Sequence, residues 1–169
     1  MAKQSTRRNF LLQAAGTSAT AITLPYFVPK RAFGANDRIQ TGHIGVRNQG
    51  GSNLRAFINH AVAVCDVDTD VLAKAVKVVE QSGRACEAFG DYRRLLDRKD
   101  IDAVVISTPD HWHALMTIDA CRAGKDVYCE KPLSLTIAEG RQMVNAARQG
   151  QRIVQTGSDR KSTRLNSSH

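Results

Sequence analysis

A glycine-containing turn and a carboxylate that follows it by 21 residues are the first features whose spacing indicates chemistry. The turn reads Gly45-Val46-Arg47-Asn48-Gln49-Gly50 and comes directly after a weakly apolar run. Dinucleotide-binding turns have glycine at the first, third and sixth positions, for a tight turn, approach of the pyrophosphate and close helix–strand packing. Asp66 lies at about the separation at which a carboxylate binds the hydroxyl groups of the adenosine ribose. Because a carboxylate repels a 2′-phosphate, the pair predicts a site for NAD in preference to NADP.

Two residues in this region leave alternatives open. Arg47 occupies the position of the middle glycine, and its guanidinium can either swing out to pair with phosphate or obstruct the dinucleotide. Asp66 could instead cap a helix that is expected to begin at Thr69, although Asp68 is better placed for that cap. The candidate cofactor-binding residues in this part of the chain are Gly45, Arg47, Gly50 and Asp66.

A lysine and two histidines could act on a substrate beside the dinucleotide. Lys131 stands in Glu130-Lys131-Pro132, directly after an apolar run. A lysine at the carboxyl end of a strand, in a partly dehydrated cleft, can hydrogen-bond an alcohol that loses hydride and assist the movement of its proton. His111 and His113 stand two residues apart without an identifiable third ligand, so we predict no metal site. For Trp112, packing is expected in preference to a sugar-binding platform.

The elements that must position these residues alternate between apolar runs and helical stretches. Strands are expected at Ile39–Gly45, Ala61–Cys65, Ile101–Ser107, Asp126–Cys129 and Arg152–Thr156. Helices are expected at Gly51–Asn59, Thr69–Gln81, Asp91–Asp97, His113–Ala123 and Thr136–Arg148. This order predicts an α/β fold with a doubly wound parallel sheet, whose ligand lies outside the carboxyl ends of the strands.

The motifs after the strands resemble those of one oxidoreductase family. Ser107-Thr108-Pro109-Asp110-His111-Trp112-His113 and Glu130-Lys131-Pro132-Leu133-Ser134, with Gly90-Asp91-Tyr92 upstream, resemble the glucose–fructose oxidoreductase and inositol dehydrogenase (Gfo/Idh/MocA) family. The resemblance covers Asn36 to Ser158. It implies that this chain forms an NAD(P)-binding Rossmann domain. It also implies that the C-terminal α/β substrate domain of the family is missing from this chain. It also implies that the complete protein forms a homo-oligomer.

The resemblance assigns roles to residues on the later strands. Thr108 and Pro109 would lie along the dinucleotide, and His111 and His113 near its nicotinamide half. Glu130 and Lys131 would sit beside the nicotinamide ribose, with Lys131 reaching the substrate. The catalytic candidates implied by the resemblance are Lys131 and His113.

The function implied by the resemblance is hydride transfer between NAD and a sugar, a sugar derivative or a polyol. A second possibility is an NAD-dependent glycosidase of the same family, which oxidises C3 of the sugar transiently and regenerates the cofactor. A third is a non-catalytic nucleotide-binding fragment. In each case the 169-residue chain alone is expected to be inactive, because the residues of the substrate domain are absent.

Both ends of the chain read as segments outside the fold. Residues 1–34 contain Arg7 and Arg8 followed by apolar residues, which resembles a twin-arginine signal and predicts export to the periplasm or cell envelope by the twin-arginine machinery. An ordinary amphipathic helix is the alternative. Residues 159–169 look like a translated sequencing adapter, with a natural polar tail as the alternative. Residues 35–158 then form the dinucleotide-binding domain.

The distribution of charge argues against a nucleic-acid partner. The chain carries a net charge of +8, of which residues 1–34 contribute +5 and residues 159–169 contribute +2, so that only +1 remains for residues 35–158. The central domain therefore has no long basic face for tracking phosphates. The four cysteines lack C-x-x-C or zinc-like spacing and are expected to be free thiols, buried at Cys65 and Cys129.

Overall fold

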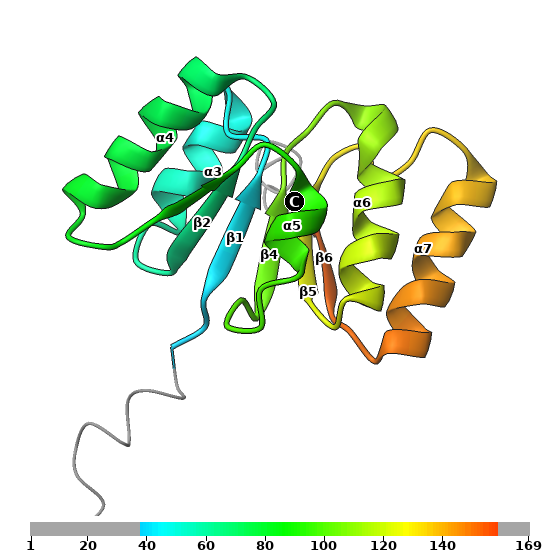
Figure 1. The fold of residues 1–169 in the computed structure, drawn as a ribbon. Helices are drawn as coiled ribbons and strands as arrows, with labels where there is room; N and C mark the ends of the chain where they lie inside the picture. Colours follow the sequence, from blue (N-terminus) through cyan, green and yellow to red (C-terminus); the bar gives the residue numbers. More distant parts are fainter. Residues whose placement is uncertain (1–37, 159–169) are drawn as a thin grey trace, which may run out of the picture. The chain divides into compact units, whose positions relative to one another are not determined.

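The computed structural model describes residues 38–158 (Figure 1). The segments interpreted above as an export signal and an artefactual tail, residues 1–34 and 159–169, lie outside the described residues. Among residues 38–158 no helix has the length and apolar character needed to cross a membrane.

The described residues form one six-stranded, wholly parallel sheet with the strand order β3-β2-β1-β4-β5-β6. The strands are β1 (Thr41–Ile44), β2 (Ala61–Cys65), β3 (Glu87–Phe89), β4 (Ala103–Ile106), β5 (Asp126–Glu130) and β6 (Val154–Gly157). The helices are α3 (Gln49–Ala56), α4 (Thr69–Gln81), α5 (Tyr92–Leu96), α6 (Asp110–Arg122) and α7 (Ile137–Gly150). The order reverses at β1 and β4, which confirms the predicted doubly wound sheet.

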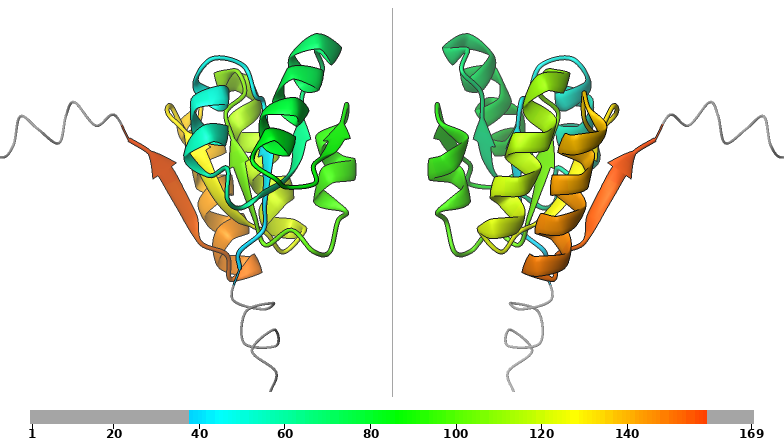
Figure 2. Two further views of the ribbon diagram at one scale, coloured as in Figure 1. Left: turned by 90° about the vertical axis from the view of Figure 1, so that its left-hand side faces the viewer. Right: turned by 90° about the vertical axis from the view of Figure 1, so that its right-hand side faces the viewer.

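Helices cover both faces of the sheet because its strands carry apolar residues on both sides. One core cluster joins Ile44, Ile106 and Cys129 of the sheet to residues of α5, α6 and α7. The other joins Val46 and Val64 to residues of α3 and α4. Figure 2 shows α6 and α7 side by side along the sheet. Cys65 and Cys129 are buried free thiols, as predicted, and Cys121 is buried as well.

Three elements differ from the sequence-based expectation, and one of them, α3, begins two residues and ends three residues earlier than the predicted Gly51–Asn59. Strand β3 was not predicted, because its residues Glu87 and Ala88 are exposed at the edge of the sheet and give no apolar run. Helix α6 begins at Asp110 rather than at His113, directly after Pro109. Apart from Trp112 its first turn is polar, so the spacing of apolar residues did not indicate a helix there.

The register of the strands brings the candidate residues to one edge. Ile44 of β1 pairs with Cys65 of β2 and with Ile106 of β4, which in turn pairs with Cys129 of β5. The residues that follow in the chain are Gly45, Asp66, Ser107 and Glu130. The carboxyl ends of four adjacent strands thus meet at the edge where open α/β sheets bind their ligands.

Candidate functional site

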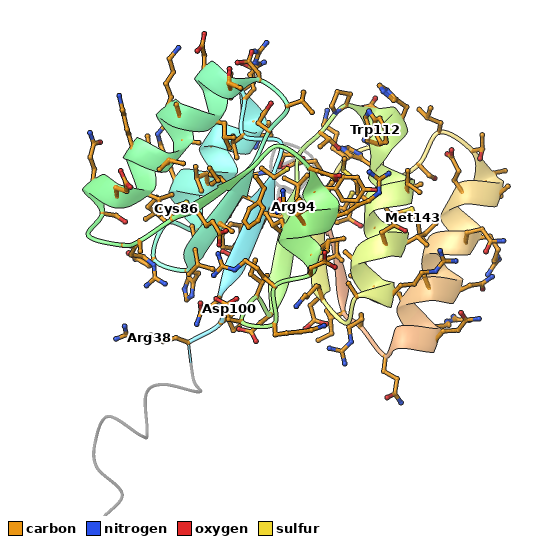
Figure 3. All side chains as sticks on the ribbon, viewed as in Figure 1. Arg38, Cys86, Arg94, Asp100, Trp112 and Met143 are labelled. Carbon is orange, nitrogen blue, oxygen red and sulfur yellow. The ribbon has the colours of Figure 1, made fainter. Side chains whose placement is uncertain are left out.

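A cleft of about 940 Å³ lies along this edge of the sheet. Five of the residues predicted from the sequence line it, namely Gly45, Arg47, Asp66, Thr108 and Pro109. Trp112, which was expected to pack, also lines the cleft and is 39% exposed near the start of α6 (Figure 3). The volume suits a large organic ligand.

The two glycines of the turn are required by close backbone contacts. Gly45 has φ +78°, and a Cβ atom there would lie 2.8 Å from the carbonyl oxygen of Ser107. A Cβ atom on Gly50 would lie 2.0 Å from the carbonyl oxygen of Gly45. Gly50 does not line the cleft; it packs α3 against the end of β1, which is the role of the last glycine in a dinucleotide turn.

The start of α3 presents free amide groups. Within residues 38–158 the backbone N–H groups of Arg47, Asn48 and Gln49 have no acceptor. The first turn of α3 holds no acidic residue, and no side chain caps it. Unpaired amides and the positive end of the helix dipole together favour an anion such as a pyrophosphate. This part of the site fits a dinucleotide.

The side chain of Arg47 is engaged by a carboxylate, and its pairing with phosphate or obstruction of the dinucleotide stays a prediction. It forms an ion pair with Asp68, at the start of α4, and remains 61% exposed. Asp68 caps α4 as predicted, with its Oδ1 accepting from the N–H groups of Asp70 and Val71. The Val71 amide above all, with the Asp70 amide and the Arg47 guanidinium, lowers the pKa of Asp68.

Asp66 is held in the cleft by two backbone amides. Its Oδ2 accepts from Val46 N at 3.0 Å, and its Oδ1 accepts from Asp68 N at 3.1 Å. Because Asp68 provides the cap of α4, the alternative role of Asp66 as that cap is excluded. Each carboxylate oxygen keeps a further lone pair for a ribose hydroxyl.

A buried network that the sequence did not reveal anchors Glu130. The Asn53 side chain of α3, which is 7% exposed, donates from Nδ2 to Glu130 Oε1 and to Ser107 Oγ, both at 2.9 Å. Tyr128 also donates to Glu130 Oε1, at 3.4 Å. Asn53 stands three residues after Gly50, and a polar residue at a core-facing position of a helix was the only signal available. The network joins α3, β4 and β5.

Lys131 and His111 are exposed beside the cleft but do not line it. The Lys131 side chain forms no hydrogen bond or ion pair within the described part of the chain, so its ammonium is not held by a protein partner there. The Lys131–Pro132 peptide bond is cis. His111 lies in the first turn of α6, and its ring is 5.9 Å from that of Trp112.

His113 lies under the cleft rather than in it. The residue is 1% exposed, with Nδ1 at 2.6 Å from the carbonyl oxygen of Pro132 and Nε2 at 2.8 Å from that of Thr108. Both ring nitrogens face backbone carbonyl oxygens, so neither is open to a substrate. A direct catalytic role for His113 stays a prediction, and this geometry favours a positioning role between two loops.

The Thr108 hydroxyl is a buried polar group that lacks a partner among the described residues. Thr108 lies at the carboxyl end of β4, with its carbonyl held by His113. A buried hydroxyl without a hydrogen bond is costly. A ligand in the cleft that Thr108 lines could supply the missing partner.

The chain is similar to known proteins over the described domain. Residues 33–158 match the family model for the oxidoreductase family with an NAD-binding Rossmann fold, GFO_IDH_MocA. A glycosyl hydrolase family 109 protein of Shewanella pealeana is 35% identical over 171 residues, which cover 86% of this chain and 38% of that protein. The chain thus spans less than half the length of this relative.

The chain is also similar to solved structures of dehydrogenases. Myo-inositol 2-dehydrogenase from Lactobacillus plantarum is 30% identical, with a TM-score of 0.64, over 70% of this chain and 36% of that protein. A levoglucosan dehydrogenase in complex with NADH is 28% identical, with a TM-score of 0.58, over 69% of this chain and 34% of that one. With its fold, its turn and its matched family model, the chain belongs to the Gfo/Idh/MocA oxidoreductase family, of which it contains the nucleotide-binding Rossmann domain.

Proposed function

We propose that the complete protein is an NAD-dependent oxidoreductase that acts on a sugar, a sugar derivative or a polyol. The observation that carries this proposal is a single cleft lined by Gly45, Asp66 and Thr108, with Lys131 exposed at the end of the next strand. The bound nicotinamide would accept the hydride. Lys131 would hydrogen-bond the substrate hydroxyl through Nζ and move its proton.

NAD is the cofactor favoured by the charges of the cleft. Asp66 follows β2, where its carboxylate can accept hydrogen bonds from both adenosine ribose hydroxyls. A 2′-phosphate would bring two negative charges toward the same carboxylate. We therefore expect NADH to bind more tightly than NADPH.

The names of several relatives favour a second function, an NAD-dependent glycosidase. Relatives that are 33–37% identical to this chain are named glycosyl hydrolase family 109 proteins. Such an enzyme would release sugar from a glycoside and regenerate its cofactor within each turnover, whereas an oxidoreductase would accumulate NADH. Measuring NADH and free sugar together in the complete protein, with Lys131→Ala as a control, separates the two functions. Release of sugar without NADH would replace the oxidoreductase proposal by the glycosidase.

We propose that the 169-residue chain binds NAD but does not turn over substrate. Much of the substrate site would come from the part of the relatives' length that this chain does not span. Oxidation of any sugar or polyol above the level of the Lys131→Ala variant would contradict this proposal. Failure to bind either cofactor would also contradict it, and it would exclude the third possibility, a non-catalytic nucleotide-binding fragment.

We also propose that the complete protein is exported and forms a homo-oligomer. Residues 1–34 would direct it through the twin-arginine machinery, so that Arg7→Lys combined with Arg8→Lys should retain it in the cytoplasm on cell fractionation. Undiminished export of that variant would refute the signal. The complete protein would form a homo-oligomer, which light scattering can measure.

A further inference from the structure

Two arginine–aspartate pairs stand in the cleft around Asp66. Arg47 pairs with Asp68, and Arg93 Nη1 lies 3.4 Å from Asp91 Oδ1. All four residues line the cleft. Asp66 is the remaining carboxylate there, held by backbone amides rather than by a cation. Both cations at this end of the cleft are therefore neutralised before a ligand arrives.

Asp68 is fixed in its orientation by the helix that it caps. Its Oδ1 accepts from Asp70 N at 3.0 Å and from Val71 N at 3.1 Å, which leaves Oδ2 for the Arg47 guanidinium. Its backbone N–H donates to Asp66 Oδ1, so the residue that holds Arg47 adjoins the candidate ribose-binding carboxylate. Arg47 is thus held close to Asp66, the carboxylate that the proposed function assigns to the adenosine ribose.

A free guanidinium at this position would favour a phosphate, because arginine binds phosphate oxygens through two parallel hydrogen bonds. An arginine already paired with a carboxylate offers a phosphate much less. We propose that Asp68 is a specificity-determining residue: by pairing with Arg47, it withholds the guanidinium from a 2′-phosphate and makes the cleft selective for NAD over NADP. This inference rests on the proposed function, since it concerns the same cofactor site.

The ion pair of Arg47 and Asp68 is exposed, so one substitution can remove it without disturbing the fold. The side chains of Arg47 and Asp68 are 61% and 39% exposed, and exposed ion pairs contribute little to stability. Asparagine and serine both cap helices well. Asp68→Asn and Asp68→Ser should therefore free Arg47 while α4 keeps its cap.

The test uses the 169-residue chain and its single tryptophan, Trp112, which lines the cleft. Quenching of Trp112 fluorescence by NADH and NADPH gives both dissociation constants for each variant. Asp68→Asn should lower the ratio of the NADPH to the NADH dissociation constant by about tenfold, the effect of one charge-assisted contact. The affinity for NADH should change by less than about twofold, because NADH has no phosphate at that position.

Two controls separate the role of Arg47 from the general loss of a negative charge. Asp70→Asn removes a carboxylate from the first turn of the same helix, where no contact with Arg47 exists, and should change the ratio by less than about twofold. Arg47→Gln combined with Asp68→Asn should lose the gain in NADPH affinity. Thermal unfolding followed by circular dichroism verifies that each variant is folded.

The outcomes distinguish failure of the inference about Asp68 from failure of the proposed function. If the chain binds NADH and both Asp68 variants leave the ratio where Asp70→Asn leaves it, the inference is overturned and the proposed function stands. A gain that persists in the double variant also overturns the inference, because Arg47 would not be the group released. If the unsubstituted chain binds neither NADH nor NADPH, the proposed function fails and the inference fails with it.

Discussion

The site has two ends, one after β1 and β2 and the other after β4 and β5, and they hold their side chains in opposite ways. At the end formed after β1 and β2, Arg47 and Asp68 meet in an exposed ion pair on the surface of two helix starts. At the end formed after β4 and β5, Asn53 is buried and ties Ser107 to Glu130. His113, also buried, ties the Thr108 loop to the Pro132 loop.

This difference indicates that the two ends have different functions. Exposed ion pairs add little stability but set the local charge, so the first end can change its ligand preference through single substitutions. Buried networks leave an unsatisfied group when any member is removed, so the second end resists change. We infer that the first end selects the cofactor and that the second keeps the loop of Lys131 in place.

The largest effect is expected at Gly50, where the two ends touch. A Cβ atom there would overlap the Gly45 carbonyl and approach Ser107 Cβ at 3.2 Å. Gly50→Ala should lower the free energy of unfolding by more than about 3 kcal/mol, measured in urea. Gly90→Ala is the matched control, because a Cβ atom at that cleft residue meets nothing within 4 Å. Equal stability of the two variants would show that the turn can move apart.

A similarly large loss of unfolding free energy is expected at acidic pH, because of the buried residue His43. His43 on β1 is buried, and its Nδ1 has no hydrogen-bond partner among residues 38–158. Burial lowers the pKa of its imidazole from 6.5 to about 4. The unfolded chain therefore takes up a proton below pH 6.5 that the folded chain accepts only near pH 4. Stability should fall across this interval by about 3 kcal/mol because of His43 alone. In His43→Leu this part of the loss should be absent, and a pH profile parallel to that of the unsubstituted chain would disprove the assignment.

An intermediate effect tests the comparison itself. Asn53→Ala leaves Glu130 and Ser107 without their buried donor and should cost about 2 kcal/mol of unfolding free energy. Arg47→Ala removes only an exposed pair and should cost less than about 0.5 kcal/mol. Urea unfolding of the two variants gives both values. Equal costs would mean that the two ends contribute equally to stability.

A modest gain in stability is expected at the turn. Asn48 adopts φ 46° and ψ −111°, a conformation that glycine tolerates and other residues adopt under strain. Asn48→Gly should raise the unfolding free energy by about 1 kcal/mol, after allowing for the greater freedom of glycine in the unfolded chain. A loss of stability would indicate that the asparagine side chain contributes more than the strain costs.

Much of the fold followed from local patterns in the sequence. Buried strands such as Ala61–Cys65 gave continuous apolar runs, and the cap at Asp68 was predicted because an acidic residue preceded a strongly periodic helix. Strand β3 escaped because its residues Glu87 and Ala88 face solvent. An edge strand is defined by its neighbour rather than by its own pattern.

The candidate site was predictable only in part. Gly45 and Asp66 could be placed because strand ends meet at one edge of a parallel sheet, and Thr108 was placed by the family resemblance. The ion pair of Arg47 could not, because it joins two helix starts that are 21 residues apart. The burial of His113 and the network of Asn53 depend on contacts between loops and helices. Spacing along the sequence does not predict such contacts.

The central claim, that this chain binds NAD through Asp66, is tested most directly by titrating NADH into the 169-residue chain and its Asp66→Ala variant while following Trp112 fluorescence. The account predicts saturable binding that weakens by about tenfold or more in Asp66→Ala, because two ribose hydroxyls lose a charged acceptor. Asp70→Ala, which removes a carboxylate outside the cleft, should bind NADH as the unsubstituted chain does. No saturable binding, or equal affinity in Asp66→Ala and Asp70→Ala, would contradict the account.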